Sequence, residues 1–277
     1  MSKDSPRFDR RTFSRIAAVA LAAGLGGFAG GKPAFAASDD AFAPLRKKAL
    51  NIGALIFPRM DQIDFTGPFS VLSRVPDATV HVMARDRQPV KDHKGFVLTP
   101  ALSFAEAPPL DVLLVPGGPG QESLMEDDAV LSVIRGHVSA GKPLFSVCTG
   151  ALICGAAGVL RGRKATTHWA AFELLRYFGA IPQDARVVVD GNLISAAGVT
   201  AGIDGALTIA SLLRGQSVAE QIQLDIQYAP EPPFNSGTPK TAPREVLEAV
   251  SGRYKPLTDA RAVTAKKIAA RIGVAGL

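Results

Sequence analysis

The chain has 277 residues, a formal net charge of +6 and 47% hydrophobic residues. A chain of this length and apolar content can bury a full core as one domain, and its sequence shows no internal repeat or low-complexity domain. The first 37 residues carry four of the six net positive charges. The rest of the chain therefore has a net charge of only about +2, which predicts neither a nucleic-acid-binding nor a membrane-binding surface.

The N-terminal segment has the order of an export signal. The basic pair Arg10 and Arg11 is followed by the uncharged 15-residue run IAAVALAAGLGGFAG and then by the small residues of KPAFAA. Paired arginines are typical of the twin-arginine route, and the run is shorter than the roughly 20 apolar residues of a membrane span, which is the alternative. We expect cleavage after Ala36, a polar linker over 37–48, and one exported, periplasmic domain over 49–277.

Strands alternate with helices along that domain. The predicted strands are ALNIGALIF, TVHVMAR, GFVLTP, DVLLV, PLFSV, ARVVVD and NLISAAG. The predicted helices are DFTGPFSVLSRV with Thr66 as a cap, DDAVLSVIRGHVSAG, TGALICGAAGVL, TTHWAAFELLRYFG, TAGIDGALTIASLLRG and SVAEQIQLDIQYA. A Pro-rich loop over 229–243 then precedes two amphipathic terminal helices, too short a segment for a paired helix-turn-helix region. This alternation predicts an α/β fold with a doubly wound, mainly parallel sheet and helices on both faces.

The stretch PLFSVCTGALICGAAGVL places Cys148 at the end of a strand and Gly150 at the start of a helix. This is the arrangement of a nucleophile elbow, and the helix N-terminus is expected to lower the pKa of the thiol. The alternative is a small buried hydrophobic residue. Cys154 lies six residues later, about 9 Å along a helix, so the two cysteines are too far apart for a disulfide. We expect Cys154 to be a core residue.

Three neighbouring features extend the candidate site. The turn PGGPG offers the backbone N–H groups of Gly117 and Gly118 to developing negative charge, or is a plain tight turn. Asp64 in DFTGP follows another strand and could transfer protons at the same edge, or serve as a loop or cap residue. His168 could be a base, or could pack and cap a helix. The four histidines lack metal-ligand spacing, and no phosphate- or dinucleotide-binding motif occurs in a strand-to-helix context.

The segments DFTGP, PGGPG, SVCTGALICGAAGVLRGRKATTHW, DGNLISAAGVTAGIDGAL and YAPEPPFNSGTP together resemble the DJ-1/PfpI superfamily, and within it the isonitrile hydratases. The resemblance covers roughly residues 49–245. It implies a flavodoxin-like fold, a homodimer, no cofactor or metal, and a small-molecule substrate. It further implies that Cys148 is the nucleophile, that Asp64 is the acid/base, and that Thr149 assists through its hydroxyl or N–H.

The resemblance predicts hydration of an isonitrile to an N-substituted formamide through a cysteine thioimidate. Superfamily peptidases carry a histidine directly after the nucleophile, whereas this chain has Thr149, which argues against proteolysis. One alternative is glyoxalase-like action on α-oxoaldehydes. The other is a non-catalytic ligand-binding module related to the sensory domain of transcription regulators, against which the export signal and the missing DNA-binding region count.

Overall fold

The computed structural model describes residues 40–274, and the predicted export signal over residues 1–36 lies outside them. The described part begins with a short 3-10 helix, η1 (Ala43–Leu45). The predicted polar linker is only partly solvent-exposed, because Phe42 and Leu45 are buried in the core. These two apolar side chains of the segment AFAPL attach it to the domain.

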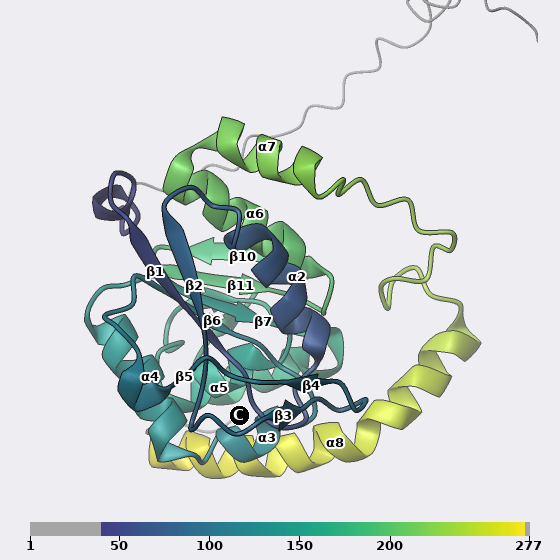
Figure 1. Cartoon of the computed structure of the whole chain (residues 1–277). Helices are drawn as coiled ribbons and strands as arrows, with labels where there is room; N and C mark the ends of the chain where they lie inside the picture. The colour runs from purple at the N-terminus through teal and green to yellow at the C-terminus, as the bar shows by residue number, and fades with distance from the viewer. Residues whose placement is uncertain (1–39, 275–277) are drawn as a thin grey trace, which may run out of the picture. The chain divides into compact units, whose positions relative to one another are not determined.

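A seven-stranded sheet forms the centre of the domain (Figure 1). All its neighbouring strands pair in parallel except β10 and β11, which form an antiparallel hairpin at one edge. In spatial order the strands are β10 (Val187–Asp190), β11 (Leu193–Ala196), β7 (Leu144–Val147), β6 (Val112–Val115), β1 (Leu50–Leu55), β2 (Ala78–Ala84) and β5 (Leu102–Ser103). Two small pairs lie outside this sheet, β3 (Val90–Lys91) with β4 (Val97–Leu98) and β8 (Lys164–Ala165) with β9 (Ile181–Pro182). The mainly parallel α/β prediction is confirmed.

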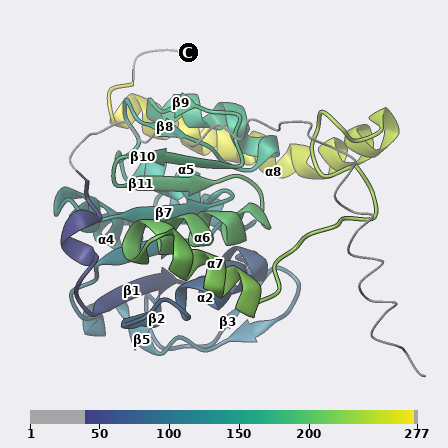
Figure 2. The ribbon, with the colours of Figure 1, turned by 90° about the horizontal axis from the view of Figure 1, so that it is seen from above.

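Helices cover both faces of the sheet (Figures 1 and 2). One face carries α2 (Gln62–Leu72), α6 (Ala201–Arg214) and α7 (Gln216–Asp225). The other carries α3 (Gln121–Leu124), α4 (Asp128–Ser139), α5 (Gly150–Ala156), η3 (Trp169–Phe178) and α8 (Arg244–Arg271). Every residue of β6 and β7 is buried, as expected for parallel strands covered on both sides. A further 3-10 helix, η2 (Phe104–Glu106), follows β5.

Helix α2 begins earlier than predicted. Its N-cap is Asp61, whose side chain accepts the N–H of Ile63 at 3.1 Å, and not Thr66. Aspartate is among the strongest N-cap residues, so the helix starts at the first such residue after β1. Pro68 consequently lies inside the helix, not in its first turn.

The two terminal helices predicted after the Pro-rich loop are a single helix, α8, with Pro256 inside it. Proline removes one backbone hydrogen bond, which predicted a break, but α8 packs along η3 and continues through this position. Two other local predictions were also wrong. TTHWAAFELLRYFG forms the 3-10 helix η3, and GFVLTP contributes only the two-residue strand β4.

Candidate active site

The loops at the carboxyl ends of β1, β6 and β7 meet around Cys148. This residue follows β7 directly, has a positive φ of 55°, and precedes α5 by two residues. A positive φ is uncommon for a residue other than glycine and is typical of a strained strand-to-helix turn. At Gly150 an added Cβ would lie 2.2 Å from the carbonyl oxygen of Val115, so only glycine allows α5 to start this close to β6. The predicted elbow is therefore present.

Asp64 lies in the first turn of α2, and its side chain is fully buried. Its Oδ2 atom accepts the backbone N–H of Gly117 at 2.9 Å, whereas Oδ1 has no hydrogen-bond partner in the described residues. Burial raises the pKa of Asp64 to about 8, with a further contribution from the negative charge of Asp61, while the Gly117 N–H and the Cys148 side chain act to lower it. The carboxyl therefore keeps its proton at neutral pH.

Burial also raises the pKa of Cys148, and the charge of Asp64 raises it further. The backbone N–H groups of Val199 and Thr149 and the positive charge of Arg261 act in the opposite direction. The expectation that the helix N-terminus leaves this thiol with a lowered pKa was wrong, because the side chain is only 5% exposed and α5 has only seven residues. Cys148 and Asp64 form a coupled pair in which the charge of Asp64 raises the pKa of the thiol, whereas the hydrogen bond from Cys148 lowers the pKa of the carboxyl group.

The glycine turn after β6 contacts both Asp64 and the residue that follows Cys148. Gly117 donates its N–H to Asp64, and Gly118 donates its N–H to Thr149 Oγ1 at 3.0 Å. Both N–H groups therefore already have protein acceptors, unlike the free oxyanion donors that the sequence predicted. The turn needs glycine at both positions, because an added Cβ would lie 2.5 Å from the Thr149 nitrogen at Gly117 and 2.2 Å from the Asp61 nitrogen at Gly118.

Thr149 connects the elbow to this turn. Its hydroxyl oxygen accepts the Gly118 N–H, and the hydroxyl lies 3.4 Å from the Gly118 carbonyl oxygen. Its backbone N–H is one of the two that lower the pKa of Cys148. The structure therefore brings Cys148, Asp64, Thr149, Gly117 and Gly118 together.

His168 lies at the edge of this group, buried beside the start of η3. Its Nδ1 accepts the N–H of Ala170 at 3.3 Å, and its ring lies 5.3 Å from the ring of Trp169 and 5.1 Å from that of Tyr254. Burial lowers the pKa of His168 to about 4, and the charge of Arg261 adds to this. Of the two roles left open, the structure favours capping and packing over that of a base.

The sequence analysis missed Arg261 and Tyr254, which reach the site from α8. Arg261 is 2% exposed and donates through Nη2 to the Gly118 carbonyl oxygen at 2.9 Å. A signal was available in the sequence, because Arg261 shares one helical face with the buried residues Ala265 and Ile268. A charged residue at helical spacing on an apolar face indicates a buried charge.

A cavity of about 690 Å³ adjoins the nucleophile. It is lined by the aromatic side chains of His168, Trp169 and Phe172 and by Val199, with Arg186 and other polar residues completing its wall. Thr167 also lines it and donates its hydroxyl to the Cys148 carbonyl oxygen at 2.7 Å. The volume suits a small organic ligand.

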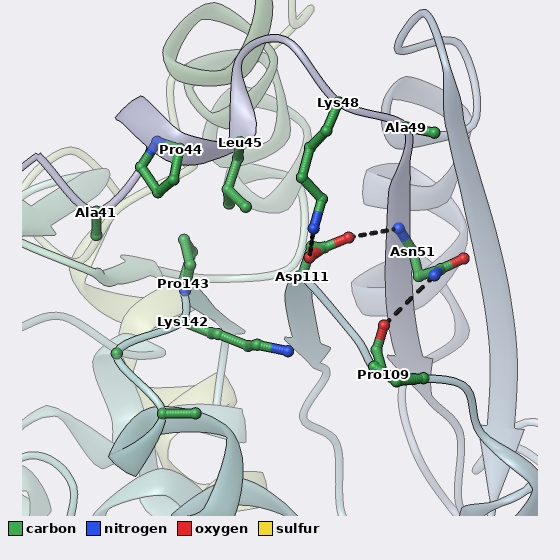
Figure 3. A pocket seen from close by; sticks show the side chains of 12 residues that line it. Ala41, Pro44, Leu45, Lys48, Ala49, Asn51, Pro109, Asp111, Lys142 and Pro143 are labelled. Atoms are coloured by element: carbon green, nitrogen blue, oxygen red, sulfur yellow. Dashed lines mark hydrogen bonds and ion pairs between the residues drawn. The ribbon is translucent and has the colours of Figure 1, made fainter.

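A second pocket, of about 440 Å³, lies at the amino ends of β1, β6 and β7 and thus at the opposite edge of the sheet (Figure 3). The Lys48–Asp111 ion pair, with 2.6 Å between its charged atoms, crosses it, and Asp111 also accepts the N–H of Asn51. It contains neither cysteine. Between residues 40 and 274, no cluster of three metal-ligating side chains occurs and no helix is long and apolar enough to cross a membrane.

The fold and the site define a class of protein: a flavodoxin-like α/β domain with a cysteine on a strand-to-helix elbow beside a buried carboxyl group. The chain belongs to the DJ-1/PfpI family, whose sequence model matches residues 51–212.

Three relatives illustrate this membership. Isonitrile hydratase from Pseudomonas putida is 46% identical over 226 residues, which cover 82% of this chain and 99% of the relative. A deglycase from Pyrococcus horikoshii is 35% identical over 118 residues, covering 42% of this chain and 71% of the relative. The crystal structure of a ThiJ/PfpI family protein from Pseudomonas syringae matches with a TM-score of 0.77 and 36% identity, covering 86% of this chain and 98% of that one.

Proposed function

We propose that this protein adds water to an isonitrile and releases an N-substituted formamide. The observation that carries the proposal is the buried pair of Cys148 and Asp64, a thiol beside a protonated carboxyl group, next to a cavity lined by aromatic and polar side chains. The 46% identity to an isonitrile hydratase along nearly all of that relative supports the choice of substrate.

The first step uses both members of the pair. Loss of the thiol proton to the solvent leaves Cys148 as a thiolate beside protonated Asp64. This thiolate attacks the terminal carbon of R–N≡C, forming the C–S bond, while Asp64 donates its proton to the same carbon. The product is a thioimidate, R–N=CH–S, covalently held on the enzyme. The N–H groups of Val199 and Thr149 hold the sulfur in place during the attack.

The second step returns the enzyme to its resting state. Asp64, now a carboxylate, takes a proton from a water molecule, whose oxygen bonds to the thioimidate carbon, and the proton passes to the substrate nitrogen. The C–S bond then breaks as the carbonyl forms. The hydroxyl proton of the intermediate returns to the Cys148–Asp64 pair, and R–NH–CHO leaves.

The R group of the isonitrile fits the 690 Å³ cavity. Trp169, Phe172 and Val199 offer apolar contacts, and Val199 also donates its N–H toward the sulfur. In this proposal the reacting carbon lies near Val199 and Thr167, which line the cavity and contact Cys148. An R group with an apolar part against Trp169 and Phe172 suits this lining.

A specific observation favours a second candidate, glyoxalase-like chemistry on an α-oxoaldehyde, because deglycases are among the relatives. The test incubates the mature protein with an alkyl isonitrile and, separately, with methylglyoxal, following formamide and lactate. Formamide production that disappears in Cys148→Ala supports the proposal. Lactate alone supports the second candidate, and ligand binding without either product indicates a non-catalytic binding module.

We also propose export by the twin-arginine route, on the basis of the paired arginines and the small-residue site near Ala36. We further propose that the protein acts on a small-molecule substrate and that it forms a homodimer. The family resemblance supports the dimer. Light scattering coupled to gel filtration tests it, and a monomer at micromolar concentration would contradict it.

A further inference from the structure

Arg261 is the only buried arginine in the part of the chain that the structure describes. The other charged pairs that involve α8 are solvent-exposed, as in Lys255 with Asp259 and Lys267 with Glu126. Arg261 forms no ion pair with any carboxylate among residues 40–274, and its Nε has no hydrogen-bond partner there. Its recorded acceptors are neutral: the Gly118 carbonyl oxygen at 2.9 Å and Thr149 Oγ1 at 3.5 Å.

A buried cation without an opposite charge is costly, so its surroundings indicate what balances it. Burial lowers the pKa of Arg261, while Cys148, Tyr254 and Glu122 act to raise it. Of these three, Cys148 contributes most and Glu122, which forms no ion pair with Arg261, contributes least, while phenol side chains ionise only in alkali. The thiolate of Cys148 is therefore the strongest counter-charge that the site itself can provide.

The two contacts of Arg261 also decide on which side of the glycine turn it acts. It reaches the Gly118 carbonyl oxygen and Thr149, the residue that follows Cys148, whereas Asp64 accepts the N–H of Gly117. The positive charge of Arg261 acts on Cys148. A positive charge near the sulfur favours ionisation of the thiol while Asp64 keeps its proton. That state, thiolate with carboxylic acid, is the one that the first chemical step requires.

We propose that Arg261 is a positioning residue of the active site, which fixes the contact between Gly118 and Thr149 and stabilises the Cys148 thiolate with its charge. Helix α8 then contributes a residue to the active site. The consequence for turnover rests on the proposed function, but the state of the thiol is measured without any isonitrile. Around the sulfur, Asp64 and Arg261, the other titratable or charged groups are Asp61, Tyr254, Glu122 and His168.

The experiment measures the rate of Cys148 alkylation by iodoacetamide against pH, with peptide mass spectrometry to separate it from Cys154, and thiolate absorbance near 240 nm as a second readout. Arg261→Met removes the charge and keeps the length of the side chain. We expect the apparent pKa of Cys148 to rise by about one unit, which slows alkylation at neutral pH about tenfold. Arg261→Lys keeps the charge and should stay within about threefold of the wild type.

Two further variants make the result decisive. Arg261→Gln keeps a donor for Gly118 but lacks the charge, so it should raise the apparent pKa of Cys148 as Arg261→Met does. It replaces Arg261→Met if circular dichroism shows that the methionine variant is unfolded. Lys267→Gln removes an exposed charge from the same helix and should leave the profile unchanged. An unchanged pH profile in the uncharged variants would overturn the proposal, and so would equal shifts in Arg261→Lys and Arg261→Gln. If no isonitrile is hydrated but the profile shifts as expected, the proposed function fails and the role of Arg261 stands.

Discussion

Replacing Asp64 with asparagine should make the protein more stable and nearly inactive at the same time. Asparagine keeps the size of the side chain and an oxygen that can accept the Gly117 N–H, but it carries no exchangeable acid proton. General acid–base catalysis contributes roughly 10² to 10⁴ in rate, and we expect this factor to be lost. The loss of activity is not a loss of fold, because the same change removes a buried acid that opposes folding.

The size of the stability gain follows from the pKa of Asp64, which burial raises from 3.8 to about 8. The unfolded chain releases this proton near pH 4, whereas the folded protein retains it at pH 7. Retaining it over about 3 pH units costs the native state about 4 kcal/mol. The free energy of unfolding of the wild type therefore falls relative to that of Asp64→Asn as the pH rises from about 4 to about 8. Below pH 4 the stabilities of the two proteins become similar.

Guanidinium chloride unfolding at pH 4 and at pH 7 measures this difference. Asp92→Asn is a matched control, since Asp92 is also buried, at 4% exposure, but its Oδ1 accepts the N–H groups of Lys94 and Phe96. Burial acts to raise the pKa of Asp92, yet these hydrogen bonds outweigh it and the net pKa is lowered. Asp92→Asn should therefore be less stable than the wild type at pH 7, with a difference that shrinks as the pH falls.

Two results would refute the reasoning on Asp64. If Asp64→Asn has the same pH dependence of stability as the wild type, the carboxyl group is not held protonated in the native state. If the folded variant hydrates isonitrile within a few-fold of the wild type, Asp64 does not transfer the proton in the reaction.

Three further predictions concern reactivity, packing and export. Limiting iodoacetamide should label Cys148 well before Cys154, because Cys154 is fully buried and only Cys148 lies near the positive charge of Arg261. Peptide mass spectrometry checks this, and equal rates would contradict it. Gly150→Ala should lower the free energy of unfolding by about 3 kcal/mol, because the added Cβ would lie 2.2 Å from a carbonyl oxygen. Gly136→Ala should raise the free energy of unfolding by about 0.5–1 kcal/mol, because no atom lies within 4 Å of the added Cβ. Similar effects of both changes in chemical denaturation would count against this packing. Replacing both arginines of the predicted export signal with lysine should leave uncut precursor in the cytoplasm on cell fractionation, and processed periplasmic protein would exclude the twin-arginine route.

The sequence predicted the features of the fold and site that depend on neighbouring residues. A buried strand followed by Cys148, Thr149 and Gly150 produces an elbow from local backbone preferences alone, and the order of strands and helices placed it at the carboxyl edge. Gly141 closes the predicted helix DDAVLSVIRGHVSAG, and it directly follows the C-cap of α4 with a φ of 73°. Glycine adopts this left-handed conformation easily, so a local signal is enough to predict where the helix ends.

The features that depend on tertiary burial could not be predicted in this way. The helix N-terminus suggested a lowered pKa at Cys148, but the nearly complete burial of the thiol and the closeness of Asp64 depend on how α2 and α8 close over it. The Gly117 N–H was expected to be free, and only the three-dimensional arrangement shows that Asp64 occupies it. Arg261 lies 113 residues after Cys148 in the sequence, so no local pattern connects the two.

The site is assembled from both faces of the sheet, and this explains why its central turn has no side chains. Asp64 approaches from α2 on one face, and Arg261 approaches from α8 on the other, while Cys148 lies on the turn between β7 and α5. Strand β6 lies between β1 and β7, so groups from both neighbours must meet across the turn that follows it. Any Cβ at Gly117 or Gly118 would collide with the backbone of one side. The absence of side chains at these two glycines therefore lets the carboxyl group and the thiol approach each other. The N–H groups of the two glycines hold Asp64 and Thr149 in place through hydrogen bonds.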